Sequence, residues 1–434
     1  MEHLLINGGR RLEGKIAVNG AKNAALPVLA ATLLATQDCH LQRLPQLQDV
    51  RVMLEVIRSL GAKAEKHGDD LVVNPGGVFA SEIPPRLMRQ LRASNLVMGP
   101  LLGRYGYFRV PYPGGCAIGS RPMDLHFKGF TALGAEVREK QGYVEAKARQ
   151  LQGATIYLDF PSVGATENLM MAAVMARGVT TLHNVAREPE ICDLQNFLNK
   201  MGARVRGAGQ DTIYIEGVSR LAGAEHRIIP DRIETGTLLA AAAGCGGDIF
   251  VQECMPEHLP AILAKLAEMG ARITIEKDGV RLQGVQRLKA VDCKTMPYPG
   301  FPTDMQPQLM ALMTVAEGTS VLVESIFDNR FKHAAELLRL GADIKIEGRV
   351  AIINGVPALS GTVVEASDLR AAAALVIAGL MAEGQTRVEG VHHLDRGYER
   401  LEARLGSLGA DIRRQKKGGN CNMPGINLKL NTQS

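Results

Sequence analysis

The chain has 434 residues, of which 46% are hydrophobic and 22% are charged, and this composition excludes a disordered or fibrous protein. Its net charge of +5 is spread along the chain and aromatic residues make up only 4%, so the basic stripe and stacking rings of a nucleic-acid-binding protein are missing. The longest apolar run, "AAAALVIAGLMAEG", is shorter than the ~18 residues that a membrane span needs.

The chain begins with "MEHLLINGGRRLEGK", in which no basic segment leads into an apolar one. A secretory signal has a basic segment followed by an apolar one. Because the first residues lack this pattern, we expect a cytoplasmic protein. Seven cysteines are scattered along the chain without a CxxC pair. This spacing argues against a disulfide framework and against a zinc site, so no metal is expected.

A helical pattern that ends in Leu/Met-Gly-Ala recurs six times along the chain, and two short strands joined by a turn follow the first five of its glycines. The glycines are separated by 73, 68, 68, 71 and 68 residues. They are Gly61, Gly134, Gly202, Gly270, Gly341 and Gly409. A glycine here is typical of a helix C-terminus, and turns such as "HGDD" and "KDG" are typical of hairpins. The spacing indicates an internal repeat.

Each repeat also contains a second helix that is apolar on nearly every face. In chain order these helices are predicted over residues 21–35, 92–106, 164–178, 232–247, 303–318 and 368–384. Such helices belong inside a bundle that other elements cover. We therefore expect an α/β fold with two groups of three repeats and a ligand site in the cleft between the groups.

A polar patch begins each apolar helix. Helix capping is one explanation for Thr166, Thr303 and Asp368, because threonine and aspartate are favoured at helix N-termini. It does not explain cations at this position, since a positive charge opposes the helix dipole there. These cations are Lys22, Arg92, Arg232 and Arg370. If the helix starts converge, the cations form an anion-binding site.

Loops at equivalent places in the repeat carry a second set of arginines. They are Arg121, Arg187, Arg330 and Arg396. The loop "PGGCAIGSRPMDLH" also holds Cys116 between glycines. A thiol beside Arg121 fits a functional group with a lowered pKa, but buried inert cysteines are common, and the residues alone leave both interpretations open.

Several long segments of the chain resemble the enolpyruvyl transferases. Among them are "NGAKNAALPVLAATLLA", "LRASNLVMGPLL", "PGGCAIGSRPMDLH", "SVGATEN", "PDRIETGT", "FPTDMQPQ" and "HLDRGYER", and the similarity runs from about Leu5 to about Arg413. The resemblance implies a cytoplasmic enzyme that transfers the enolpyruvyl group of phosphoenolpyruvate to the 3-hydroxyl of UDP-N-acetylglucosamine, with release of phosphate through a tetrahedral intermediate. Such an enzyme takes the first committed step of peptidoglycan synthesis, serves cell shape and division, is a fosfomycin target, and uses two small-molecule substrates and no cofactor.

The resemblance also assigns roles to individual residues. Catalysis would depend on Lys22, Cys116, Asp304 and Arg396, with Cys116 as the acid and Asp304 as the base. Phosphoenolpyruvate would be held by Lys22, Asn23, Arg121 and Arg396. The nucleotide sugar would contact Arg92, Arg121, Pro122, Met123, Asp124, Leu125, Ser162, Val163, Gly164, Asp304, Ile326 and Phe327. Further active-site residues would be Arg232, Arg330, Asp368 and Arg370.

The fold implied by the resemblance is a two-domain inside-out α/β barrel of six βαβαββ-like units, three in each domain. Residues 1–21 with 230–418 would form one catalytic domain, and residues 22–229 the other, which carries the Cys116 loop. Residues 419–434 match nothing in the repeat and are expected to be a disordered tail, in which Cys421 has no assigned role.

Two other interpretations compete with this one. A sister enolpyruvyl transferase acts on shikimate 3-phosphate, but it typically begins with a GSKS-like motif and lacks the cysteine loop, unlike "NGAKNAA" and "PGGC" here. A non-catalytic repeat scaffold would have lost the reactive groups, yet Lys22, Cys116, Asp304 and Arg396 are all present. A variant nucleotide sugar as acceptor also stays open.

Overall fold

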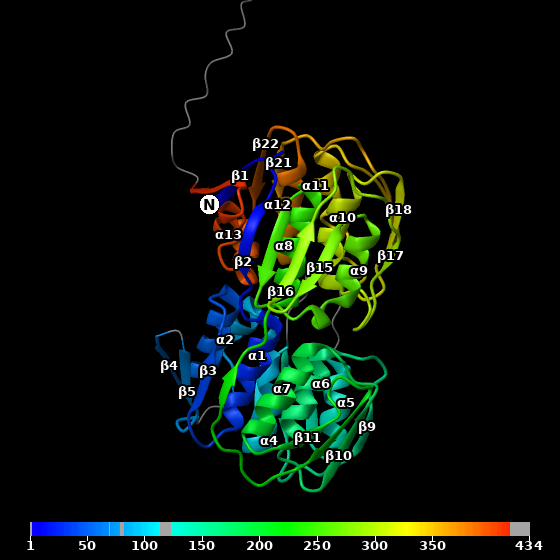
Figure 1. Ribbon diagram of the computed structural model, residues 1–434. Coiled ribbons are helices and arrows are strands. Elements are labelled where there is room, and N and C mark those ends of the chain that lie inside the picture. The colour runs from blue at the N-terminus through cyan, green and yellow to red at the C-terminus, as the bar shows by residue number, and fades with distance from the viewer. Residues whose placement is uncertain (1, 69, 79–81, 113–122, 417–434) are drawn as a thin grey trace, which may run out of the picture.

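The computed structural model describes residues 2–68, 70–78, 82–112 and 123–416 (Figure 1). The predictions for Cys116, Arg121, Pro122 and the tail at 419–434 lie outside these residues. Figure 1 shows two lobes, and each has its own cluster of buried apolar side chains. We call the lobe whose cluster uses residues 21–228 the first lobe, and the lobe whose cluster uses residues 4–18 and 233–412 the second lobe.

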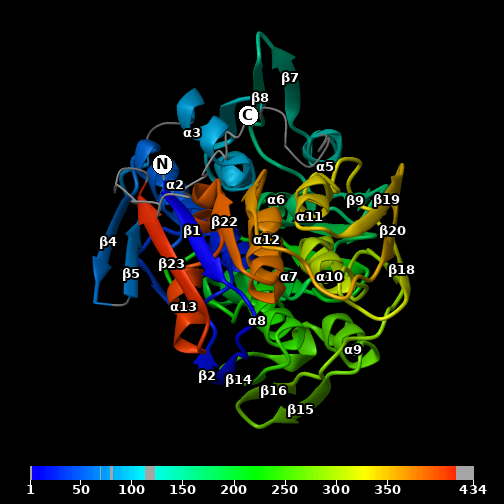
Figure 2. The same cartoon turned by 90° about the horizontal axis from the view of Figure 1, so that it is seen from above.

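The predicted apolar helices are present in both lobes. Those of the first lobe are α1 (Lys22–Ala31) with η1 (Thr32–Leu34), η2 (Arg92–Val97) with α4 (Met98–Tyr105), and α6 (Val163–Ala173). Those of the second lobe are α8 (Arg232–Gly244), η4 (Thr303–Met305) with α10 (Gln306–Met313), and α12 (Leu369–Met381). Figure 2 shows α8, α10 and α12 inside the second lobe, where they contact one another. Within the described ranges, no helix is long and apolar enough to cross a membrane.

The predicted amphipathic helices lie just before the repeated glycines. They are α2 (Gln48–Ser59), α5 (Asp124–Ala132), α7 (Pro189–Lys200), α9 (Pro260–Glu268), α11 (Ala334–Arg339) and α13 (Leu401–Ser407). All six glycines have φ between 90° and 109°, a conformation that costs glycine little because it has no Cβ. Their predicted place at helix C-termini is therefore confirmed. Shorter helices are α3 (Pro85–Gln90), η3 (Pro256–His258) and η5 (Val391–Arg396).

Strands form six sheets in the described part of the chain, three in each lobe. The first lobe has the sheets β13 (Glu225–Arg227)–β3 (Cys39–Gln42)–β5 (Asp70–Asn74)–β4 (Lys63–His67), β11 (Arg204–Arg206)–β12 (Thr212–Glu216)–β10 (Val179–His183)–β9 (Thr155–Tyr157), and β6 (Tyr107–Pro111)–β8 (Tyr143–Lys147)–β7 (Glu136–Lys140). The second lobe has the sheets β21 (Val363–Glu365)–β22 (Gln385–Glu389)–β1 (Glu2–Asn7)–β23 (Asp411–Lys416), β15 (Arg272–Glu276)–β16 (Gly279–Gln283)–β14 (Asp248–Gln252)–β2 (Glu13–Ala17), and β17 (Cys293–Lys294)–β18 (Thr319–Val323)–β20 (Val350–Asn354)–β19 (Asp343–Glu347).

The predicted hairpins follow the glycines. The antiparallel pairs are β4–β5, β7–β8, β11–β12, β15–β16 and β19–β20. In β5 the residues Leu71 and Val73 are buried and alternate with more exposed ones, as expected of a strand with one face on a core. The strand β1 pairs with β22 and β23, so it belongs to the second lobe although it begins the chain.

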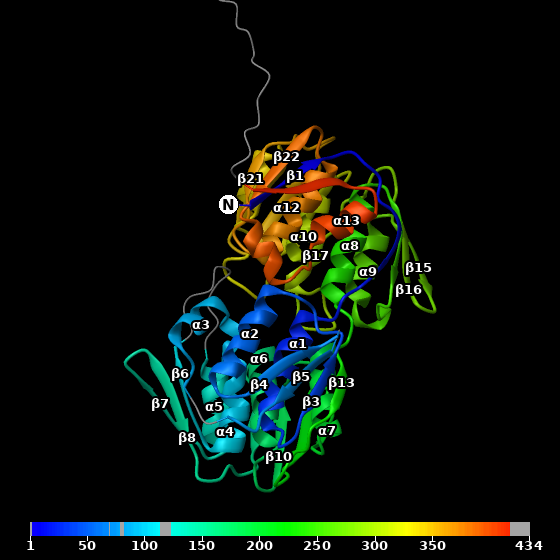
Figure 3. The same cartoon turned by 90° about the vertical axis from the view of Figure 1, so that its left-hand side faces the viewer.

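The chain passes between the lobes twice, and the two crossings lie side by side. An isolated β-bridge joins Gly20 to Pro230, and the Ala21 N–H donates to the Ile229 carbonyl at 2.7 Å. Figure 3 shows α1 and α2 at the side of the first lobe that faces the second. The helix starts at these crossings are thus brought close to the junction of the lobes.

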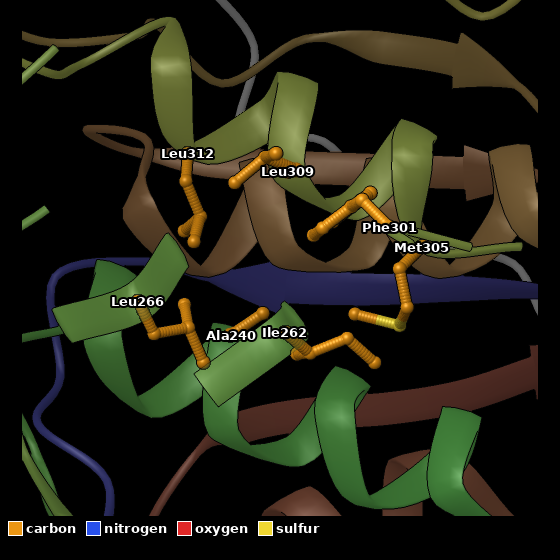
Figure 4. A pocket seen from close by; sticks show the side chains of 7 residues that line it. All are labelled: Ala240, Ile262, Leu266, Phe301, Met305, Leu309 and Leu312. Atoms are coloured by element: carbon orange, nitrogen blue, oxygen red, sulfur yellow. The ribbon is translucent and has the colours of Figure 1, made fainter. Parts of the chain in front are cut away.

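A small apolar cavity lies within the second lobe, between α8, α9 and α10 (Figure 4). Its lining residues are Ala240, Ile262, Leu266, Phe301, Met305, Leu309 and Leu312. None of these side chains is charged, so the cavity is a gap in core packing and offers nothing to an anionic ligand.

Candidate active site

Lys22, Asp49 and Arg396 form an ion-pair cluster where the two lobes meet. Lys22 begins α1 in the first lobe, and Arg396 ends η5 in the second. The Asp49 carboxylate, in the first turn of α2, lies 3.2 Å from Nζ of Lys22 and 2.9 Å from Nε of Arg396. The Lys22 and Asp49 side chains are 11% and 4% exposed, whereas Arg396 is 35% exposed. Two cations predicted to hold phosphoenolpyruvate are therefore brought together, and one of them can still be reached by a ligand. Asn23, which follows Lys22 in α1, is half-buried.

Asp304 forms a second cluster with two buried arginines. One carboxylate oxygen is 3.2 Å from Nη2 of Arg330, and the other is 2.8 Å from Nη2 of Arg370. Burial raises the pKa of Asp304, but the charges of Arg370, Arg330 and Lys22 outweigh burial and hold that pKa well below its usual value. Asp304 is therefore ionised at neutral pH, as a proton acceptor must be.

Lys22 connects the two clusters electrostatically. Burial is the main reason why the pKa of Lys22 is lowered, and Asp49 opposes it most strongly. Arg370 and Arg396 lower this pKa further, while Asp304 raises it. The charges of both clusters therefore act on the Lys22 ammonium group, which links the two clusters electrostatically.

The buried hydroxyl group of Tyr398 holds Arg370 in place through a hydrogen bond. Oη of Tyr398 accepts a hydrogen bond from Nη1 of Arg370 at 3.1 Å and another from Nε2 of Gln308 at 3.2 Å. It also lies 2.9 Å from Oγ1 of Thr237. These partners come from α8, α10 and α12, so the core of the second lobe fixes the arginine that pairs with Asp304.

Arg232 begins α8 and pairs across the junction with the first lobe. Its Nε lies 3.0 Å from the Glu190 carboxylate of α7, and its guanidinium carbon is 5.6 Å from the centre of the Tyr298 ring. Burial raises the pKa of Glu188 beside it, and burial together with Glu190 and Glu188 raises the pKa of Glu167 well above its usual value. Arg232 therefore serves a buried acidic cluster as its counter-ion.

Three of the predicted nucleotide-sugar contacts lie at the start of α6. The Ser162 side chain caps this helix, and Val163 and Gly164 beside it are half-buried. A Cβ on Gly164 would lie 3.6 Å from the His126 ring. Burial, with a smaller contribution from the Arg92 charge, lowers the pKa of His126 to about 4. Arg92, at the start of η2, is thus close enough for its charge to lower the pKa of His126 beside the start of α6.

Three further predicted contacts lie at the start of α5 and differ in exposure. Met123 is buried and its Sδ accepts a hydrogen bond from Nδ2 of Asn95 at 3.3 Å. Asp124, the first residue of α5, is exposed, and Leu125 is half-buried. A ligand could reach Asp124 directly, whereas Met123 packs into the first lobe.

Ile326 and Phe327 are tied to the turn that carries Asp304 by one carboxylate, Glu324. Oε1 of Glu324 accepts from the backbone N–H groups of Ile326 and Phe327 at 2.8 and 3.1 Å and from Oγ1 of Thr295 at 2.9 Å. Its Oε2 accepts from Oγ1 of Thr303 at 2.9 Å. The side chain is 1% exposed. Glu324 thereby fixes the predicted nucleotide-sugar loop beside the predicted base.

Capping explains Asp368 but not the two threonines. The Asp368 carboxylate accepts from the N–H groups of Arg370 and Ala371 at 2.9 and 3.1 Å. For Thr166 and Thr303 capping was wrong, because Thr166 Oγ1 donates to the Ser162 carbonyl and Thr303 Oγ1 to a carboxylate. Asp368 therefore acts on the site through the start of α12, beside Arg370.

Sequence reasoning missed Asp49, Glu324 and Tyr398. Asp49 stands in the first turn of an amphipathic helix, where an acidic residue is ordinary, and Glu324 follows a strand. Tyr398 stands two residues after Arg396 in "HLDRGYER". This closeness to a predicted site residue was the one feature of the sequence that could have pointed to Tyr398.

Comparison with known proteins supports the same family. The family model for EPSP synthase (3-phosphoshikimate 1-carboxyvinyltransferase) matches residues 6–405. Proteins named UDP-N-acetylglucosamine 1-carboxyvinyltransferase 1 match nearly end to end. The one from Carboxydothermus hydrogenoformans is 57% identical over 414 residues and covers 95% of this chain and 98% of its own. The one from Caldanaerobacter subterraneus is 55% identical over 404 residues, with 93% and 97% covered, and the one from Symbiobacterium thermophilum is 55% identical over 419 residues, with 95% of each chain covered.

Solved structures share the mixed α/β fold. The enolpyruvyl transferase NikO from Streptomyces tendae superposes with a TM-score of 0.86 at 28% identity, covering 95% of this chain and 98% of its own. An EPSP synthase from Acinetobacter baumannii superposes with a TM-score of 0.76 at 19% identity, covering 96% and 100%, which shows the fold alone. From the family match and these relatives, the chain belongs to the EPSP synthase family of enolpyruvyl transferases.

Proposed function

We propose that this chain transfers the enolpyruvyl group of phosphoenolpyruvate to the 3-hydroxyl of UDP-N-acetylglucosamine and releases inorganic phosphate, in the cytoplasm and at the start of peptidoglycan synthesis. The observation that carries the proposal is the identity of 55–57%, over 93–95% of the chain, to proteins named for this activity. The two ion-pair clusters at the lobe junction supply the charges that the reaction needs.

Phosphoenolpyruvate is the substrate that the cations would hold. Its phosphate and carboxylate groups need several positive charges. Lys22 and Arg396 supply two of them side by side, because they contact the two carboxylate oxygens of Asp49. Arg121, outside the described residues, is proposed as a third cation. Binding between the lobes would exclude water and strengthen each charge interaction.

The proposed reaction has three proton transfers, one carbon–oxygen bond formed and one carbon–oxygen bond broken. The Cys116 thiol, outside the described residues, gives a proton to the methylene carbon of phosphoenolpyruvate. The sugar 3-hydroxyl oxygen bonds to the neighbouring carbon while its proton passes to the Asp304 carboxylate. The Cys116 thiolate then takes a proton back from the new methyl group, which expels phosphate, restores the double bond and regenerates the thiol. The nucleotide sugar is proposed to lie against Arg92, Asp124, the start of α6, and Ile326–Phe327.

Asp304 gains base strength when the anionic substrate binds. In the free protein its pKa is held low by Arg370, Arg330 and Lys22, so it is a weak proton acceptor. A phosphate group on Lys22 offsets part of this positive charge, and the pKa of Asp304 then rises towards its ordinary value. Proton removal from the sugar is thereby linked to the presence of phosphoenolpyruvate.

We also propose that each lobe is a domain built as an inside-out α/β barrel of three repeated units, with boundaries at 1–21 plus 230–418 and at 22–229. Two observations support this division. The two clusters of buried apolar side chains change over between residues 18 and 21 and between residues 228 and 233. Each lobe also has three sheets around its apolar helices.

Release of phosphate from phosphoenolpyruvate tests the proposed activity. The protein is incubated with phosphoenolpyruvate alone, with UDP-N-acetylglucosamine, or with shikimate 3-phosphate. We expect release only with the nucleotide sugar. Release only with shikimate 3-phosphate would assign the sister activity, and no release with either acceptor would contradict the proposal.

A further inference from the structure

Asp49 has an unusual position for an acidic residue in the first turn of a helix. Such a residue ordinarily faces the free N–H groups of its own helix or solvent. Here the side chain is 4% exposed, and its oxygens contact Nζ of Lys22 at 3.2 Å and Nε and Nη2 of Arg396 at 2.9 and 3.5 Å. Asp49 therefore forms ion pairs with two cations, one from each lobe.

The two cations would repel each other without this carboxylate. The Arg396 charge disfavours the charged form of Lys22, whereas the Asp49 charge favours it. Each oxygen of the carboxylate has a different main partner, so the aspartate also fixes the distance and angle between the ammonium and the guanidinium. A single carboxylate thus holds both charges in place.

The contact with Asp49 does not use all the N–H donors of either cation. Lys22 has three N–H donors and Arg396 has five, and Arg396 keeps about a third of its side chain exposed. An anion arriving between the lobes can therefore bind both cations while Asp49 still holds them from the other side. Two cations that are already held in place bind an anion better than two cations that must first be brought together.

We propose that Asp49 is a positioning residue that locks Lys22 of the first lobe to Arg396 of the second and so assembles the phosphoenolpyruvate site from both lobes. This inference rests on the proposed function. It implies that the Asp49–Arg396 contact between the lobes and the formation of the anion site are one event, because the same carboxylate takes part in both.

The test is the kinetics of Asp49→Asn in the full-length protein, with phosphate release as the assay. We expect the KM for phosphoenolpyruvate to rise at least tenfold and the KM for UDP-N-acetylglucosamine to stay within twofold. Asp248→Asn is the matched control, because Asp248 pairs with Arg281 on the surface of β14, and it should leave both constants unchanged.

The pH profile gives a readout that a merely structural role would not move. Lys22 is faced by Asp49 from α2, Asp304 from η4, Arg370 from α12 and Arg396 from η5. Removing the Asp49 charge leaves the arginines less opposed, so the alkaline limb of kcat/KM for phosphoenolpyruvate should move to lower pH. Asp49→Glu keeps the charge and should keep this limb at the wild-type pH, and it takes over the test if Asp49→Asn does not fold.

Specific outcomes would overturn the inference. These are a KM for phosphoenolpyruvate within twofold of wild type in Asp49→Asn, an equal rise in both KM values, or an alkaline limb that moves in Asp49→Glu as well. Failure of the proposed function is distinguishable, because the wild-type protein would then release no phosphate with the nucleotide sugar.

Discussion

At the scale of single residues, three of the apolar helices have a cation in their first turn although the helix dipole opposes it. Each cation contacts a buried or half-buried carboxylate. The pairs are Lys22 with Asp49, Arg232 with Glu190, and Arg370 with Asp304. A charge near a helix end is worth roughly 0.3–1 kcal/mol, whereas two opposite charges about 4 Å apart interact by roughly 4 kcal/mol near a protein surface. The carboxylate contacts therefore outweigh the dipole, and the cations are kept where a ligand needs them.

Cys116 is the residue whose proposed role is most easily isolated. Cys116→Ser should lower phosphate release at least a hundredfold, because a serine hydroxyl is a much weaker acid than a thiol. The variant should also resist inactivation by fosfomycin, an epoxide that alkylates thiols. Both effects can be measured in the same phosphate assay after preincubation with the epoxide.

The control for this prediction is Cys245→Ser. Burial raises the pKa of Cys245 to about 12, so its thiolate is scarce at neutral pH and the substitution should change neither turnover nor inactivation. Undiminished inactivation of Cys116→Ser would show that the reactive thiol lies elsewhere.

At the scale of elements, Glu324 joins the end of β18 to η4. It accepts four hydrogen bonds and is almost fully buried, so Glu324→Ala leaves several donors without an acceptor. We expect the free energy of unfolding to fall by about 3 kcal/mol, measured by urea denaturation. The KM for UDP-N-acetylglucosamine should rise more than that for phosphoenolpyruvate, because the 326–327 loop loses its anchor.

The matched control for Glu324→Ala is Glu347→Ala. Glu347 is also at the end of a strand, but its side chain is 63% exposed and pairs with Lys345 on the surface. Its replacement should change the unfolding free energy by less than about 0.5 kcal/mol. If Glu324→Ala behaved like this control, Glu324 would have no anchoring role.

Helices α6 and α7 meet at an acidic cluster whose stability depends on pH. The pKa of Glu167 is raised well above the ordinary 4.5 by burial and by Glu190 and Glu188. The folded protein therefore keeps a proton that the unfolded chain loses, and this contribution to stability is present below about pH 4.5 and is lost as the pH rises through the folded-state pKa. Glu167→Gln keeps the shape but cannot ionise.

We therefore expect the unfolding free energy of Glu167→Gln to fall less between pH 5 and pH 8 than that of wild type. The difference in slope should approach about 1.4 kcal/mol per pH unit below the folded-state pKa. The comparison needs urea denaturation at several pH values, with Glu65→Gln at an exposed position as control. An identical slope in wild type and Glu167→Gln would show that Glu167 is already ionised in the folded protein.

At the scale of the whole molecule, the repeat made most of the fold predictable. The glycine spacing and the hydrophobic pattern are local properties, and helices, hairpins and the positive φ of the six glycines all occur where the pattern indicated. The pairing of β1 with β22 and β23 was not predictable in this way, because it joins residues 378 to 414 positions apart. Local patterns say which strands exist but not which distant strands they meet.

From the sequence alone, a residue of the candidate site could be singled out only where its own segment made it unusual. Lys22 and Arg370 stood out because each violates a local rule at a helix start. Asp49 violates none, and its partner Arg396 is 347 residues away, so only the three-dimensional structure brings them together. Residues that balance charge across two lobes are hidden in the sequence for this reason.

The most direct test of the proposed function is the identity of the product. The protein is given phosphoenolpyruvate labelled with ¹³C at all its carbons, together with equal concentrations of UDP-N-acetylglucosamine and shikimate 3-phosphate, and the acceptors are analysed by mass spectrometry. We predict a labelled enolpyruvyl ether on the nucleotide sugar and none on shikimate 3-phosphate. Label on shikimate 3-phosphate, or on neither acceptor, would contradict the account.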